Sequence, residues 1–303
     1  MKVFVTGASG HVGSAVVPEL LNAGHTVVGL ARSENAAEAL KTAGAAVWRG
    51  DLSDLDSLSA AAAEADGVIH LAYRHDLAFS GQPNGFLEAA LVDLAAVKAM
   101  GQALVGTNKP FVITSGTAIL SLNGEVRKVV EDDHLPRGPR VDCENWAIGL
   151  AEQGVRSAVV RLAPSVHSTL DQHGFLAMLV AIAKKNGFAA YVGDGQNVWN
   201  AVNTLDAASL YRQVLEKAPA GKRWHAVAEE EVPFRSIAEA LGAQLGIPVR
   251  SLNQEEATLY FGGFLNFSLM NCPASSAHTR AILDWVPTHN TILEDLKLPH
   301  YFR

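Results

Sequence analysis

The stretch Lys2-Val3-Phe4-Val5-Thr6-Gly7-Ala8-Ser9-Gly10-His11-Val12-Gly13 joins an apolar run to a glycine-rich loop, and an amphipathic segment over 14–23 follows. This order predicts a strand, a tight turn and the start of a helix. Gly7 permits the turn, Gly10 lets backbone N–H groups approach a phosphate, and Gly13 allows helix and strand to pack closely. We therefore predict a pyrophosphate cradle formed by Gly7, Ser9, Gly10, His11, Val12 and Gly13.

The first half of the chain repeats this alternation of strand and helix. Short apolar runs predict strands near 2–6, 26–30, 45–49, 67–71, 110–114 and 157–161. The pattern is typical of a Rossmann-type, doubly wound α/β domain with a parallel sheet, here over residues 1–165. Helices near 174–185, 206–217 and 234–245 and a strand near 224–227 predict a smaller, mixed C-terminal substrate lobe over 166–303. The segment near 201–210 is a candidate to return to the main sheet.

Composition and charge limit the classes of partner. The chain has 303 residues, of which 18% are charged, and a net charge of -7, so no basic field is available to hold a nucleic acid. Cys143 and Cys272 are far apart and lack a metal-ligand spacing, which predicts reduced thiols and no metal site. The longest apolar run, 175–183, is too short to span a bilayer, and the first strand leaves no room for a signal peptide. We expect a soluble, cytoplasmic protein that binds a small molecule and no membrane.

The end of the second predicted strand indicates which dinucleotide binds. It reads Leu30-Ala31-Arg32-Ser33. An acidic residue at this point binds the ribose hydroxyls of NAD, whereas an arginine accommodates the 2′-phosphate of NADP. We therefore predict NADP(H), with Arg32 and Ser33 at the phosphate, although a solvent-exposed Arg32 is an alternative. Asp51-Leu52 follows the third strand, where the carboxylate could accept from the adenine amino group or cap the next helix.

Further motifs follow the strands in order. They are His70-Leu71-Ala72, Phe111-Val112-Ile113-Thr114-Ser115-Gly116-Thr117, Arg161-Leu162-Ala163-Pro164-Ser165-Val166-His167, and Ala281-Ile282-Leu283-Asp284-Trp285-Val286-Pro287 with Ile292-Leu293-Glu294-Asp295-Leu296. With the opening loop and Asp51-Leu52, they resemble the extended short-chain dehydrogenase/reductase family over essentially the whole chain. The resemblance implies an architecture of the NAD-dependent epimerase type. It also implies a nicotinamide near the fourth to sixth strands, with candidate contacts at Leu71, Ala72, Pro164 and Val166.

The catalytic motif of that family is missing, so the chain resembles its atypical members. The family places a Ser or Thr where Gly116 stands, and a YxxxK helix where this chain reads Arg140-Val141-Asp142-Cys143-Glu144. Arginine thus replaces the tyrosine and glutamate replaces the lysine. Arg140 and Glu144 could form a solvent-exposed pair at i and i+4. Alternatively, both face the nicotinamide, where Arg140 binds a substrate oxygen and Glu144 orients it.

The proton donor must then come from another element. Tyr73 and His75 follow the fourth strand, at the sheet edge where ligands of open α/β folds bind, and are the preferred candidates. His167 and His173 are second choices. Hydroxyl groups that could bind a carbonyl oxygen at the same edge belong to Thr114, Ser115 and Thr117.

These residues predict an NADPH-dependent oxidoreductase that reduces a carbonyl or conjugated C=C of a small apolar or aromatic metabolite. Two alternatives stay open: a non-redox epimerase, dehydratase or isomerase on the same fold, and a non-catalytic module that senses NADP(H). The resemblance also implies a homodimer formed through helices near 84–105 and 140–153. An apolar stripe of Val92, Leu94, Val97 and Leu104 suits such a seam, and equally suits packing on the sheet.

Overall fold

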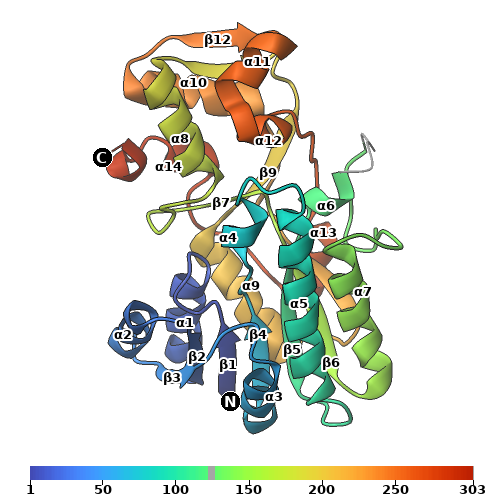
Figure 1. Cartoon of the computed structure of the whole chain (residues 1–303). Coiled ribbons are helices and arrows are strands. Elements are labelled where there is room, and N and C mark those ends of the chain that lie inside the picture. The colour runs from blue at the N-terminus through green and yellow to red at the C-terminus, as the bar shows by residue number, and fades with distance from the viewer. Residues whose placement is uncertain (122–126, 303) are drawn as a thin grey trace.

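The structure is a computed structural model that describes residues 1–121 and 127–302. Its centre is a parallel sheet of seven strands in the order β10-β6-β5-β4-β1-β2-β3 (Figure 1). The bounds are β1 Lys2–Thr6, β2 Thr26–Ala31, β3 Ala46–Arg49, β4 Gly67–His70, β5 Pro110–Gly116, β6 Arg156–Leu162 and β10 Lys222–Ala226. The prediction of a Rossmann-type doubly wound sheet is confirmed.

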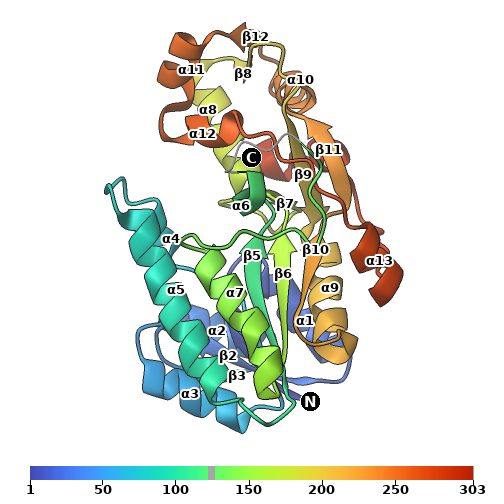
Figure 2. The same cartoon turned by 90° about the vertical axis from the view of Figure 1, so that its right-hand side faces the viewer.

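Helices cover both faces of this sheet (Figure 2). One face packs against α1 (Gly13–Asn22), α2 (Glu34–Thr42) and α9 (Thr204–Lys217) in a shared apolar core. The other face packs against α3 (Leu55–Glu64), α5 (Gly85–Gln102) and α7 (Val141–Gly149), which η1 (Leu150–Gln153) extends. Successive residues of a strand point to opposite faces, which is why Phe4 joins the second core while Val3 and Val5 join the first.

The second lobe lies beyond the carboxyl ends of the strands (Figure 1). It contains a three-stranded sheet of β11 (Glu229–Pro233), β9 (Val198–Asn203) and β7 (Ser165–His167), and a parallel pair of β12 (Val249–Leu252) and β8 (Ala189–Val192). Its helices are α8 (Phe175–Asn186), α10 (Phe234–Leu245), α11 (Gln254–Phe261), η2 (Gly262–Phe264), α12 (Leu265–Ser268), α14 (Ile292–Asp295) and η3 (Pro299–Phe302). Phe264 and Phe267 pack with Phe175 in its aromatic core.

The chain returns to the main sheet within the segment near 201–210, as the helix α9 and not as a strand. The strand at 198–203 pairs with β7 and β11, and so stays in the second lobe. Helix α9 then packs on the main sheet, and β10 adds the edge strand beside β6. The strand expected near 224–227 therefore belongs to the Rossmann sheet. Helix α13 (Ala277–Leu283) also packs against β10 and α9, so residues 166–303 interleave with both lobes.

The short helices α4 (His75–Ala78) and α6 (Ala118–Ser121) follow β4 and β5 at the edge that faces the second lobe. Val97 of α5 and Leu104, just beyond its end, are buried in the core, while Val92 and Leu94 of α5 pack against it from partly buried positions. The stripe thus faces the interior of the domain. Within the two described ranges, no helix combines the length and apolarity needed to cross a membrane.

Candidate functional site

The glycine loop between β1 and α1 is shaped so that only glycine fits at two positions. Gly7 has a φ of +68°, and a Cβ there would lie 2.7 Å from the backbone nitrogen of Ala72. A Cβ on Gly13 would lie 2.1 Å from the carbonyl oxygen of Gly7. In the described structure, the backbone N–H groups of Ser9, His11 and Val12 donate to no backbone carbonyl. These geometries suit a phosphate group, as the sequence predicts.

The carboxyl ends of β2, β3 and β4 bring charged side chains together. Arg74 donates two hydrogen bonds of 2.8 Å to Asp76, and the Arg32 guanidinium lies 3.9 Å from the same carboxylate. Hydrogen bonding from Arg74 lowers the pKa of Asp76 to about 2. Burial would raise the pKa of Asp51, but hydrogen bonds from Ser53 and the charges of both arginines hold it below its usual value.

Ser33 and Asp51, two of the residues predicted to contact the cofactor, already have hydrogen-bond partners within the chain. The Ser33 hydroxyl caps α2 by accepting from Ala36 N at 3.2 Å, and the Asp51 carboxylate accepts from the hydroxyl of Ser53 at 2.8 Å. Arg32 itself is largely exposed, with 63% of its side chain open to solvent. Its guanidinium is therefore accessible to a ligand at the end of β2.

Tyr73 and Arg140 meet at the candidate catalytic edge. The Arg140 guanidinium carbon lies 4.1 Å from the centre of the Tyr73 ring, and Arg140 also donates to the carbonyl of Thr114 at 2.7 Å. The Tyr73 hydroxyl is buried and has no hydrogen-bond partner among residues 1–121 and 127–302. Burial raises the pKa of the Tyr73 phenol, while the Arg140 charge opposes that rise. An unpaired phenol beside a cation is suited to donate a proton to a bound oxygen.

Aromatic rings extend this edge toward the second lobe. The Tyr73 ring lies 5.1 Å from the His75 ring and 6.4 Å from that of Phe86. His75 stacks on Phe79 at 6.1 Å, and Phe79 lies 6.1 Å from Phe267 of α12. Desolvation of the imidazole and the charge of Arg140 lower the pKa of His75. Rings from both lobes thus form an apolar wall beside Tyr73.

Behind Arg140 lies a buried polar chain that the sequence reasoning missed. The Thr6 hydroxyl lies 2.7 Å from Nδ1 of His70, and Nε2 of His70 lies 3.0 Å from Oδ1 of Asp93 on α5. The other carboxylate oxygen of Asp93 is 3.9 Å from Nη2 of Arg140. Asp93 is the one charged residue in the apolar run 89–97. A single acidic residue within an apolar segment is the feature of the sequence by which Asp93 could have been found.

The hydroxyl groups of β5 point in different directions. Thr114 donates to the carbonyl of His70 at 2.8 Å and pairs with the Tyr211 hydroxyl at 2.8 Å. Ser115, one residue on, is buried and its hydroxyl has no partner. Thr117 is fully buried and bonds to Asn200 at 3.1 Å. Ser115 therefore has bonding capacity to spare, whereas Thr117 links the two lobes.

Two predicted histidines already have polar partners within the chain. His167 is fully buried, with Nδ1 2.7 Å from Asp295 and Nε2 3.7 Å from Glu229. Burial would lower its pKa, but these carboxylates raise it overall. His11 pairs through Nε2 with Thr204 at 2.9 Å. A catalytic role for His167 does not fit this geometry, because both of its nitrogens face carboxylates of the second lobe.

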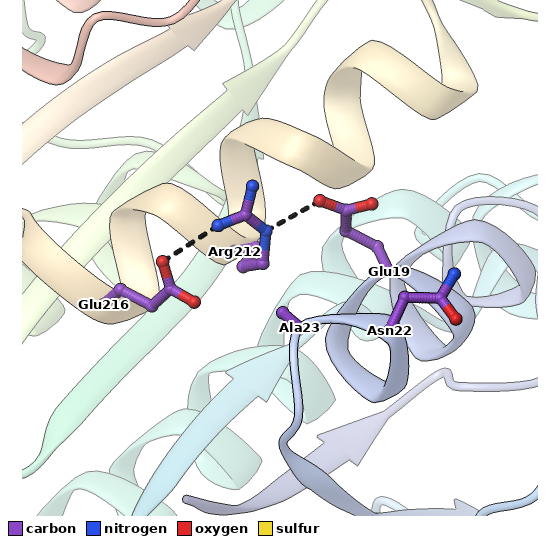
Figure 3. Close-up of a pocket in the computed structure, with 5 residues that line it drawn as sticks. All are labelled: Glu19, Asn22, Ala23, Arg212 and Glu216. Atoms are coloured by element: carbon purple, nitrogen blue, oxygen red, sulfur yellow. Dashed lines mark hydrogen bonds and ion pairs between the residues drawn. The ribbon is translucent and has the colours of Figure 1, made fainter.

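A surface pocket lies elsewhere, between α1 and α9. It is lined by Glu19, Asn22, Ala23, Arg212 and Glu216 (Figure 3). Arg212 donates to Glu19 at 2.7 Å and to Glu216 at 3.0 Å, so the charged groups that line the pocket are paired with one another. The lining residues of α1 belong to its C-terminal part, whereas the glycine loop precedes its N-terminus. This pocket is separate from the candidate catalytic edge.

Residues 3–141 match the model of the NAD dependent epimerase/dehydratase family. An uncharacterized protein of Schizosaccharomyces pombe is 44% identical over 302 residues, covering 100% of both chains, and one of Saccharomyces cerevisiae is 42% identical over 98% of both. The chain belongs to the NAD dependent epimerase/dehydratase family. This places it among the extended short-chain dehydrogenases/reductases.

Two further comparisons concern proteins of named activity. The 2-alkyl-3-oxoalkanoate reductase of Stenotrophomonas maltophilia is 28% identical over 260 residues, covering 82% of this chain and 77% of that protein. The crystal structure of DesIV, a dTDP-glucose 4,6-dehydratase of Streptomyces venezuelae with NAD bound, has a TM-score of 0.78. At 17% identity it covers 100% of this chain and 97% of its own, and so supports the fold.

Arg140 and Glu144, which stand at the tyrosine and lysine positions of the family's motif, have different partners in this chain. Glu144 is 1% exposed and forms ion pairs with Arg161 of β6 and Arg223 of β10. Arg140 faces Tyr73 and Asp93 instead. Both expectations for these residues are therefore wrong: they do not form a solvent-exposed pair, and Glu144 does not orient Arg140. The partners of Glu144 come from distant strands, which spacing along one helix does not reveal. Arg140 alone belongs to the candidate catalytic edge.

Proposed function

We propose that the protein is an atypical, NADP(H)-dependent oxidoreductase of the extended short-chain dehydrogenase/reductase family. Its substrate would be a small apolar or aromatic molecule with a carbonyl or conjugated C=C group. The observation that carries the proposal is the stacking of Arg140 on Tyr73, whose hydroxyl is unpaired at the carboxyl edge of the sheet.

The chain's own residues fit a bound dinucleotide. Gly7 and Gly13 have no room for a Cβ, and the free N–H groups of Ser9, His11 and Val12 would bind the pyrophosphate. Arg32 and Ser33 would bind the 2′-phosphate, and Asp51 with Leu52 the adenine. Leu71, Ala72, Pro164 and Val166 would border the nicotinamide. When bound, this cofactor supplies the hydride of the reaction.

Tyr73 would supply the matching proton. As the substrate carbon is reduced, negative charge develops on its oxygen, and a phenol within hydrogen-bond reach can protonate that oxygen. Arg140 would stabilise the developing charge electrostatically, because its guanidinium holds its own proton at neutral pH. The pair thereby takes over the work that the family assigns to tyrosine and lysine on one helix.

The aromatic wall supports an apolar substrate. Phe79 and Phe86 are 52% and 43% exposed, although they lie beside the candidate catalytic edge. Large exposed apolar groups next to converging polar ones are typical of ligand sites. The oxoalkanoate reductase relative, whose name denotes a ketone substrate, agrees with this class.

A panel of aliphatic ketones, aromatic ketones and enones, followed at the NADPH absorbance band with product masses, tests the proposal. We expect consumption of NADPH with one of these classes and loss of turnover in Tyr73→Phe. The matched control is Tyr191→Phe, because Arg235 stacks on Tyr191 at 5.2 Å in the second lobe. Turnover without net NADPH consumption would favour an epimerase or dehydratase. Binding without any turnover would favour a sensing module.

The proposal includes a homodimer through α5 and α7. Leu87 and Leu91 of α5 are 46% and 56% exposed, and an exposed apolar helix face suits a partner surface. Light scattering of the wild type and of Leu87→Glu checks this. We expect a dimer in the first and a monomer in the second, and a monomeric wild type would refute the assignment.

A further inference from the structure

Asp93 is a buried carboxylate that the proposed reaction does not use directly. It is 1% exposed and lies on α5, and no nitrogen or oxygen donor of the described residues reaches its Oδ2, although hydrogen bonding with the Cys143 thiol contributes to lowering its pKa. An unpaired oxygen on a buried carboxylate is costly, so its retention calls for a reason. The nearest cation is Arg140, whose Nη2 lies 3.9 Å from that oxygen.

We infer that Asp93 is a positioning residue that holds Arg140 against Tyr73 and partly neutralises the charge that Tyr73 experiences. The inference deepens the proposed function, because it rests on Tyr73 as the proton donor. It adds a residue on α5 that touches neither the substrate nor the cofactor.

The position of Asp93 is itself fixed from the opposite side. An ionised carboxylate only accepts hydrogen bonds, so Nε2 of His70 donates to Asp93, and Nδ1 pairs with the Thr6 hydroxyl. Thr6 and His70 are direct neighbours in the register of β1 and β4. The Asp93 carboxylate is thus held by the central strands β1 and β4. Its position in turn fixes the position of Arg140.

Charges at this place act strongly on one another. Burial would raise the pKa of Asp93, but the charge of Arg140 and the hydrogen bond from His70 keep it below its usual value, so the carboxylate is ionised at neutral pH. For Tyr73, burial raises the pKa, Arg140 lowers it, and Asp93 raises it again. The net result keeps the phenol protonated, as a proton donor must be.

The charged or titratable groups facing Tyr73 come from three helices. They are Arg140 and Cys143 of α7, Asp93 of α5 and His75 of α4. Burial raises the pKa of the Cys143 thiol well above its usual value, so it adds no charge near neutral pH. Apart from burial, the pKa of Tyr73 is therefore set chiefly by the charges of Arg140 and Asp93.

The test measures the titration of Tyr73 without any substrate. Fluorotyrosine is incorporated into the whole chain, and fluorine NMR identifies the Tyr73 resonance by its loss in Tyr73→Phe. In Asp93→Asn the Tyr73 midpoint should fall by on the order of one pH unit, a tenfold change in proton affinity. In the Arg140→Gln background, Asp93→Asn can act on Tyr73 only through the direct loss of its charge, so the difference between the two shifts measures the positioning of Arg140, and equal shifts in both backgrounds would overturn that role.

Asp295→Asn is the matched control, since it removes another buried carboxylate paired with a histidine, His167, far from Tyr73. It should leave the Tyr73 midpoint unchanged. An unshifted midpoint in folded Asp93→Asn, or an equal shift in Asp295→Asn, would overturn the inference. If Asp93→Asn does not fold, carboxyl NMR of Arg140→Gln decides: the pKa of Asp93 must rise when Arg140 is lost.

These outcomes are distinct from a failure of the proposed function. Turnover that survives Tyr73→Phe would refute Tyr73 as the donor, whatever the NMR midpoint. A midpoint that ignores Asp93, together with turnover lost in Tyr73→Phe, would refute only the positioning role.

Discussion

Glu144 and Arg161 form an ion pair in which both side chains are almost fully removed from water, with 2% and 0% of their surface exposed. Arg223 of β10 also pairs with Glu144, and Asn145 accepts from Arg223 at 2.7 Å. This cluster fastens α7 to the two strands at one edge of the main sheet. It therefore also fixes where Arg140, at the start of α7, is presented.

Loss of the Glu144 charge should destabilise the fold. Glu144→Gln leaves the buried guanidinium of Arg161 and the half-buried one of Arg223 without their carboxylate, and we expect a loss of about 3–5 kcal/mol in the free energy of unfolding. Urea denaturation measures it. Glu239→Gln, which breaks the exposed i,i+4 pair with Arg235, should change stability by less than about 0.5 kcal/mol. Equal effects of the two substitutions would contradict the structural role of Glu144.

Stability should also fall in mildly acidic solution because of His225. Burial and the neighbouring Arg161 lower its pKa from 6.5 to about 4. Between these values the unfolded chain binds a proton that the folded chain does not, so stability present above pH 6.5 is lost as the pH falls toward 4. Urea midpoints against pH should show a shallower decline in His225→Gln. A decline of the same slope would assign the effect to other groups.

Turnover should depend on Tyr73 and Arg140 to different degrees. Tyr73→Phe removes the proton donor and should lower kcat by roughly 10²–10⁴-fold. Arg140→Gln removes electrostatic stabilisation and should cost roughly 10²–10³-fold. Steady-state kinetics on the best substrate of the panel provides both values. If His75→Gln lost more activity than Tyr73→Phe, the imidazole would be the donor.

The cofactor prediction is tested by affinity alone. Arg32→Ala removes charge-assisted hydrogen bonds to a 2′-phosphate, so NADPH binding should weaken by roughly 10- to 100-fold while NADH binding stays the same. Calorimetric titration measures both. Arg235→Ala, whose side chain pairs with Glu239 in the second lobe, is the control. Wild-type binding of NADH as tight as that of NADPH would contradict the choice of cofactor.

Substitution in the glycine loop should separate backbone strain from steric conflict. Gly7→Ala and Gly24→Ala both place a side chain at positive φ, which costs roughly 1–2 kcal/mol. Only at Gly7 does the new Cβ meet backbone atoms within 3 Å, whereas nothing lies within 4 Å at Gly24. We expect weaker cofactor binding and a larger loss of stability for Gly7→Ala alone. Thermal melts and NADPH titration compare the two variants.

The sequence was sufficient for features that depend on local pattern. Glycine spacing and strand periodicity predicted the tight loop between β1 and α1 and the six strands of the first half. The sequence could not predict contacts between segments that lie far apart along the chain. Glu144 meets arginines of β6 and β10, and Arg140 meets Tyr73 across the sheet edge. Such partners are chosen by the topology of the sheet, which places separate strand ends together, and not by spacing along one helix.

The late arrival of β10 has a consequence for biosynthesis. The Rossmann sheet gains its last edge strand only after the chain has passed through the second lobe and come back. A nascent chain that has emerged as far as residue 165 would leave the edge of β6 open and the face covered by α9 bare. The Rossmann lobe is therefore complete only once α9 and β10 have been synthesised, after the first part of the second lobe. No single cut in the chain releases either lobe whole, because α9 and β10 lie between segments of the second lobe.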